Sequence, residues 1–218
     1  MSPTTIGGHD VTVVGAVHPI AAGWLVVAAK LRGGSFVPDL PRVIPDLARA
    51  MEGRPRFDAV GLNVAVGDPA LAKTGRRACD LASEALLGIN PKRARKAQAD
   101  ATAKALMKQR RQEALQTIGS RHQRTAFEFL PELSLFQLTN GENSELSTPF
   151  DLDVASEALS SLPGVDRILE AELDGVGRED LIRASLGLWT ARRVIARLAV
   201  RMPDDPVIVD GFRVELLR

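Results

Sequence analysis

The segment 57–66 constrains the fold of this chain more than any other part of its sequence. It is apolar almost throughout and includes Val60, Leu62, Val64 and Val66. A strand with one face in water alternates apolar and polar residues, whereas a strand covered by helices on both faces is apolar at nearly every position. We therefore expect segment 57–66 to be a strand at the centre of a sheet that helices cover on both faces.

Three further strands are expected before this central one. Residues 11–17 and 23–31 are rich in β-branched side chains, which favour strands. A hairpin through residues 18–20 would join these two runs. The glycine pair at 33–34 then predicts a turn into a short third strand over residues 35–37.

Helices are predicted where apolar residues recur at intervals of three and four positions. The expected helices cover residues 46–51, 79–87, 151–162 and 181–200. Further strands are expected at 125–129 and at 207–216, the last one interrupted at 210–211. Together these elements predict an α/β fold, a mixed sheet with helices on both faces.

The segment 91–123 differs in composition from the rest of the chain. Most of it is Ala, Lys, Arg and Gln, which are strong helix formers, and its apolar stripe is modest. We expect a basic helical segment or insertion within a single domain over residues 1–218. Its candidate nucleic-acid contacts are Lys92, Arg93, Arg95, Lys96, Lys104, Lys108, Arg110 and Arg111. No aromatic residue stands among them for base stacking, so a solvated helix face is the favoured interpretation.

Charge and cysteine content narrow the functional classes. The 28 Lys and Arg residues against 27 Asp and Glu give a net charge of +1, so no whole-molecule field would draw the protein onto nucleic acid or an anionic membrane. The single cysteine, Cys79, excludes an internal disulfide and fits a reducing compartment. No charged N-terminal region followed by an apolar run is present, nor about 20 consecutive apolar residues. We expect a cytoplasmic protein that does not enter a membrane.

Several stretches of the chain resemble one known family. They include TVVGAVHPIAAGWLVVA, AVGLNVAVGDP, RTAFEFLPELSLFQLTNG and DLIRASLGLWTARRVIARLAVRMPDDP, and they occur in order over most of the chain. The pattern resembles the family catalogued as domain of unknown function 429, predicted nucleases with an RNase H-like fold. This resemblance implies a cleft where acidic residues at strand ends hold Mg²⁺ or Mn²⁺ for phosphodiester hydrolysis.

The chain departs from the family pattern at most of the metal-binding positions that the resemblance implies. Two divalent ions need several carboxylates that converge on one point, and arginine is a fixed cation. We therefore expect the metal site to be lost. Two alternatives remain for the retained acids: Glu128 pairs with Arg183, or Glu128 and Glu132 are both exposed at a strand end and a helix start. The expected ligand positions hold Ala16 or Val17, Asn63, Leu130 and Arg183, whereas Glu128 and Glu132 are retained.

Three functional hypotheses remain open from the sequence. The first is a non-catalytic, RNase H-like pseudonuclease without a cofactor. It would bind a protein partner, a second copy of itself or a small ligand through the former metal cleft. The second is a nuclease dependent on Mg²⁺ or Mn²⁺, with a rearranged site drawn from Asp10, Asp68, Glu128, Glu132 and Asp180. The third is a nucleic-acid-binding module without catalysis. Both His18 and His122 are interpreted as ordinary surface histidines in turn-like contexts.

Overall fold

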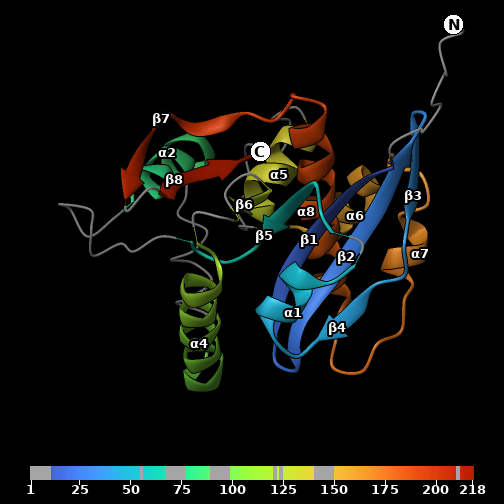
Figure 1. The fold of residues 1–218 in the computed structure, drawn as a ribbon, viewed down its shortest axis with the longest axis horizontal. Helices are drawn as coiled ribbons and strands as arrows, with labels where there is room; N and C mark the ends of the chain where they lie inside the picture. Colours follow the sequence, from blue (N-terminus) through green and yellow to red (C-terminus); the bar gives the residue numbers. More distant parts are fainter. Residues whose placement is uncertain are drawn as a thin grey trace, which may run out of the picture.

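A computed structural model describes residues 11–54, 56–66, 77–88, 99–119, 122, 125–139, 150–209 and 212–218, with the backbone alone for 207–209 and 212–214. One eight-stranded mixed sheet runs through the molecule (Figure 1). Its strands are β1 (Thr12–Ile20), β2 (Gly23–Arg32), β3 (Ser35–Pro38), β4 (Arg42–Ile44), β5 (Ala59–Leu62), β6 (Ala126–Phe129), β7 (Arg201–Val209) and β8 (Phe212–Leu217).

The strands follow the order β3-β2-β1-β5-β6-β8-β7, and β4 also pairs with β2. The strands β1, β5, β6 and β8 run parallel, so their carboxyl ends meet at one edge of the sheet. The register places Val17 beside Leu62, Leu62 beside Glu128 and Glu128 beside Leu216. Chemistry in sheets of this kind gathers at such an edge.

Helices cover both faces of the sheet, as the sequence predicts for an α/β fold. The described helices are α1 (Leu47–Glu52), α2 (Ala78–Leu87), α4 (Ala101–Thr117), α5 (Pro131–Leu138), α6 (Leu152–Leu159), α7 (Asp166–Leu169) and α8 (Arg178–Ile195). One core lies between the sheet and α5 to α8, and another joins the opposite face to α1 and α4. A third, smaller core joins α2 and α5 to β7 and β8.

The close approach of α8 to the sheet depends on Gly187. A Cβ atom at this position would lie 2.3 Å from the ring of Phe129 and 2.7 Å from the Cβ of Ala16. Because only glycine leaves that space, the middle of α8 lies directly on β1 and β5, with the Phe129 side chain of β6 against it. Polar residues at the start of α8 are thereby held near the strand ends.

The predicted central strand is confirmed, since β5 lies between β1 and β6. It is shorter than the apolar run 57–66, because β5 ends at Leu62 and the chain then leaves the sheet. The hairpin expected at residues 18–20 is wrong: these residues continue β1, and the turn lies at 21–22. A proline is tolerated at position 19 because β1 pairs with β5 only as far as Val17, so one side of the strand is an edge there.

The single last strand expected at 207–216 is also wrong. Residues 201–217 form an antiparallel hairpin, β7 and β8, in which Arg201 pairs with Leu217. The register shifts between Met202 and Val207, where two prolines interrupt the ladder. The residues at 210–211, read as an interruption of one strand, lie outside the described residues and separate two strands.

The basic segment 91–123 is helical over α4, with Asp100 capping its first turn through a 2.7 Å bond from the Ala103 amide. The single domain expected over residues 1–218 stays a prediction. Among the described residues, no helix combines the length and the apolar character that crossing a bilayer requires.

Candidate functional site

The carboxyl ends of β1, β5 and β6 form the candidate site, where the sequence places the former metal cleft. The two candidates for the first ligand position, Ala16 and Val17, point to opposite faces of β1 and are fully buried in the two main cores. They contribute no polar atom to the site. Leu130 is likewise buried, in the third core with Leu133 and Leu216.

Glu128, at the end of β6, is held by an arginine that sequence reasoning missed. The Arg77 guanidinium donates from Nη1 to Oε2 and from Nη2 to Oε1 of Glu128, both over 2.6 Å. The Val66 amide donates to the same Oε2 over 2.8 Å, and the Val66 carbonyl accepts from Arg77 over 2.9 Å. Both charged side chains are buried, with 2% and 3% of their surface exposed.

A second carboxylate also accepts hydrogen bonds from Arg77. Asp80, one turn into α2, accepts from Nε over 2.9 Å and from Nη2 over 2.8 Å. Burial alone would lower the pKa of Arg77, but the neighbouring charges of Glu128 and Asp80 raise it well above its ordinary value. Arg77 is therefore a fixed cation placed between two carboxylates. The sequence feature that could have indicated this role is an arginine three residues before an aspartate at the start of a helix.

Arg183 pairs with Glu132, and the pair expected between Glu128 and Arg183 is wrong. Its Nη1 donates to Glu132 over 3.1 Å, and its Nε donates to Glu179 over 2.7 Å. The guanidinium also stacks on the ring of Phe150 at 4.1 Å. The prediction failed because Glu128 and Glu132 lie on different elements: β6 directs Glu128 toward α2, while α5 directs Glu132 toward α8.

A polar chain of three side chains crosses from β5 to α8 through His18. The amide nitrogen of Asn63 lies 2.7 Å from Nδ1 of His18, and Nε2 of His18 lies 3.2 Å from Oδ1 of Asp180. With the amide donating to Nδ1, the ring carries its proton on Nε2 and donates it to Asp180. The interpretation of His18 as a surface residue is wrong, since only 6% of it is exposed.

Asp180 is ionised at neutral pH. Burial would raise the pKa of this carboxyl, but the hydrogen bond from His18, the Gly177 amide and the charge of Arg183 together lower it below its ordinary value. The Gly177 amide donates to Oδ2 over 2.9 Å, which fixes the carboxylate at the N-terminus of α8. His122, the other histidine considered, lies in a turn with its Nδ1 3.4 Å from the Gly119 amide.

A cavity of about 910 Å³ opens between these strand ends and α4. Its volume lies in the range of small-molecule sites. On the sheet side it is lined by His18, Pro19, Asn63, Val64, Ala65, Glu128 and Phe129, and on the α8 side by Glu179, Asp180 and Arg183. On the α4 side it is lined by Ala103, Lys104, Leu106, Met107, Lys108, Arg110 and Arg111.

The C-terminal half of α4 is docked on the body of the protein. Glu113 accepts from the Trp24 indole over 2.9 Å, from the Leu47 amide over 2.6 Å and from Arg110 over 3.0 Å. Arg110 also donates to the carbonyls of Ile20 and Ala21 and is only 7% exposed. The prediction that Arg110 contacts nucleic acid is therefore wrong, because an arginine that is buried in the docking contact cannot reach a phosphate.

The other candidate nucleic-acid contacts divide into two groups. Lys104 and Lys108 are exposed on α4, one turn apart, and Arg111 is half-buried. The remaining four fall outside the described residues: Lys92, Arg93, Arg95 and Lys96. Of the carboxylates considered for a rearranged site, Asp10 and Asp68 also fall outside them.

The Mg²⁺ or Mn²⁺ implied by the resemblance does not fit the described carboxylates as they stand. A guanidinium occupies both oxygens of Glu128, and another occupies Oε1 of Glu132. Within the described part of the chain, no three His, Cys, Asp or Glu side chains gather as metal ligands. A divalent ion placed beside Arg77 or Arg183 would meet a cation at close range.

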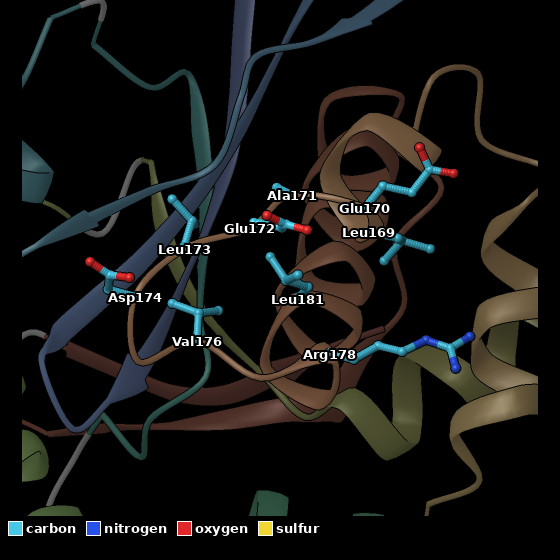
Figure 2. A pocket seen from close by; sticks show the side chains of 9 residues that line it. All are labelled: Leu169, Glu170, Ala171, Glu172, Leu173, Asp174, Val176, Arg178 and Leu181. Atoms are coloured by element: carbon cyan, nitrogen blue, oxygen red, sulfur yellow. The ribbon is translucent and has the colours of Figure 1, made fainter.

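A second hollow, of about 570 Å³, lies between α7 and α8, away from the strand ends (Figure 2). Its apolar lining includes Leu173, Val176 and Leu181. The carboxylates of Glu170, Glu172 and Asp174 lie apart from one another around it and do not converge on one point. The strand-end cavity is therefore the better candidate site.

Comparison with known proteins gives one match. A family model described as a protein of unknown function (DUF429) matches residues 10–208. No curated protein and no solved structure was found to match the chain.

Proposed function

Because the chain belongs to the DUF429 family, we propose that it is a non-catalytic, RNase H-like protein that binds a small ligand in the cavity at its strand ends. The RNase H-like fold is part of this proposal. It is supported by the mixed sheet, in which an antiparallel β1–β2–β3 unit leads into parallel strands with carboxylates at their ends.

The observation that carries the proposal is the placement of two arginines on the two retained glutamates. Arg77 and Arg183 neutralise Glu128 and Glu132 in the place where metal ions would have to do so. At about 4 Å, a unit charge interacts with another by about 4 kcal/mol at an effective dielectric of 20. Binding a divalent cation would therefore require displacing a buried guanidinium from its carboxylate.

A small ligand is preferred over a protein partner because the candidate surface is concave. Apolar side chains of the cavity lining include Pro19, Val64, Leu106 and Phe129, and charged side chains of α4 and α8 complete it. That arrangement is typical of small-molecule sites, whereas protein interfaces are usually broader and flatter. A nucleic-acid role loses one of its candidate contacts, since Arg110 is buried against β1.

The direct test is a nuclease assay on the purified protein. Single- and double-stranded DNA, RNA and hybrids are incubated in Mg²⁺ and in Mn²⁺. We expect no cleavage above a metal-free control. Metal-dependent cleavage that Glu128→Gln abolishes, and that Glu170→Gln on the surface leaves unchanged, would overturn the proposal.

Calorimetric titration with Mn²⁺ keeps the test independent of how well the variants fold. The wild-type protein should show no saturable heat up to millimolar Mn²⁺. Saturable binding to a site that involves Glu128 would support the nuclease alternative. Binding of oligonucleotides that weakens steeply with salt, without cleavage, would support the nucleic-acid-binding alternative instead.

A further inference from the structure

The strand-end cavity has two walls of opposite charge. On the α8 side, Glu179 and Asp180 line the cavity, and Glu132 lies behind Arg183. Of the two carboxylates that line the cavity, Glu179 pairs with Arg183, whereas Asp180 accepts hydrogen bonds from His18 and the Gly177 amide. This acidic wall therefore keeps negative charge after its internal ion pairs are formed. Asp180 contributes to it at neutral pH, because its pKa is lowered.

The α4 wall has the opposite sign. Lys104 and Lys108 lie one turn apart and both line the cavity. Neither lysine forms an ion pair with any described residue, while the Glu113 carboxylate nearby is committed to Arg110 and Trp24. Two ammonium groups with no carboxylate of this wall to neutralise them give the α4 side a positive field.

Apolar side chains separate these two charged walls. On α4, Ala103, Met107 and Ala114 follow one helical stripe, which also holds the docked Arg110. Its C-terminal members are buried against the sheet, with Arg110 at 7% and Ala114 at 0% exposure. Met107, further toward the N-terminus, is 40% exposed and faces the cavity. The stripe continues past the docked part of the helix and needs an apolar occupant to cover it.

We propose that the ligand of this cavity is a dipolar organic molecule with an apolar body, an ammonium group directed at Asp180 and Glu179, and a carboxylate directed at Lys104 and Lys108. This inference rests on the proposed function, because it names the ligand class of the same site. A purely anionic molecule would meet the acidic wall, and a purely cationic one would meet the two lysines. Only a ligand with both charges complements both walls.

The test uses three probes that share one six-carbon body: 6-aminohexanoate, hexanoate and hexylammonium. The ω-amino acids with four and eight carbons vary the distance between the charges. Binding is followed by calorimetry and by amide shifts in NMR spectra. We expect saturable binding of at least one ω-amino acid, and about tenfold weaker binding for each singly charged probe, the usual scale of one charge-assisted hydrogen bond.

Variants on each wall assign the two ends of the ligand. Lys104→Gln combined with Lys108→Gln should weaken the probes that carry a carboxylate and leave hexylammonium unchanged. Glu179→Gln, at a half-exposed position, should weaken the probes that carry an amine and leave hexanoate unchanged. Lys30→Gln on β2, outside the cavity, is the matched control and should change neither.

Two results would overturn the proposal. The first is hexanoate or hexylammonium binding as tightly as the ω-amino acids, since one charge would then suffice. The second is no saturation by any probe below about 10 mM, a very weak affinity for a cavity of this size. Either result leaves the nuclease and Mn²⁺ experiments standing, so failure of the ligand class can be told apart from failure of the proposed function.

Discussion

Replacement of Arg77 by methionine tests the electrostatic argument most directly. Arg77→Met removes a buried cation but keeps an unbranched side chain of similar length. Glu128 then loses two charge-assisted hydrogen bonds and keeps the one from the Val66 amide. Asp80 also loses two bonds, but its side chain is 20% exposed, so water compensates part of that loss.

The magnitude follows from removing one member of a buried ion pair. Removing one member of a buried pair typically costs 3–5 kcal/mol, so we expect about 4 kcal/mol for Arg77→Met. This is a large share of the 5–15 kcal/mol that stabilises an ordinary domain. For a chain of this length, each kcal/mol lowers the midpoint temperature by about 2–4 °C, so Tm should fall by about 8–16 °C.

Urea unfolding at pH 7, followed by circular dichroism, measures this loss. The double variant Arg77→Met with Glu128→Met should recover more than half of it, because two apolar side chains replace the whole pair. Arg49→Met is the matched control, since the exposed Arg49–Asp46 pair should contribute at most about 1 kcal/mol. The reasoning is refuted if Arg77→Met costs less than about 1 kcal/mol, or if the double variant is no more stable than the single one.

Three further predictions follow from contacts of the fold. Gly187→Ala should destabilise the protein by about 1–3 kcal/mol in urea unfolding, despite the better helix propensity of alanine, because its Cβ would overlap Phe129; Gly119→Ala, in open space, is the neutral control. Glu113→Ala should release α4, measured as faster proteolysis within 101–117 and changed Trp24 fluorescence; unchanged cleavage would contradict the docking role. Asp180→Asn should destabilise the protein at pH 7, and this difference should begin to shrink as the pH falls below about 4 and be lost only below the lowered pKa of the folded state, because Asp180 stabilises the fold only while its carboxylate is charged. A difference in urea unfolding that does not shrink at all between neutral and strongly acidic pH would contradict the ionic role of Asp180.

Helices and strands could be predicted where the residues of one segment indicate the element without reference to the rest of the chain. The helix ending at Gly88 is an example, because that glycine adopts a φ of 68° after an apolar helical repeat. The central position of β5 follows in the same way from a continuous apolar run. The short strand β4 and the hairpin of β7 and β8 were missed, since both depend on pairing with distant strands. A three-residue strand such as β4, which pairs only with β2, is too short to show an alternation of apolar and polar residues.

The candidate site was predicted in position but not in its contacts. Glu128 lies in β6 as expected, and Glu132 lies in the first turn of α5, directly after that strand. Their partners could not be deduced, because Arg77 lies 51 positions from Glu128 along the chain, and Arg183 lies 51 positions from Glu132. His18 was misread for the same reason. Its burial depends on α8 closing over the end of β1, and no local pattern around a His-Pro pair reports that contact.

The two arginines also explain how two glutamates can be buried at the strand ends. A carboxylate with almost no exposed surface is costly unless a cation and hydrogen bonds offset its desolvation. Arg77 and Arg183 supply both, so the strand ends remain folded around Glu128 and Glu132. A guanidinium, however, has no vacant coordination position and cannot lower the pKa of a bound water as a divalent ion does. Under the proposed function, the ion pairs that keep these carboxylates buried take the place of a water-activating metal ion, and the cavity beside them serves for binding.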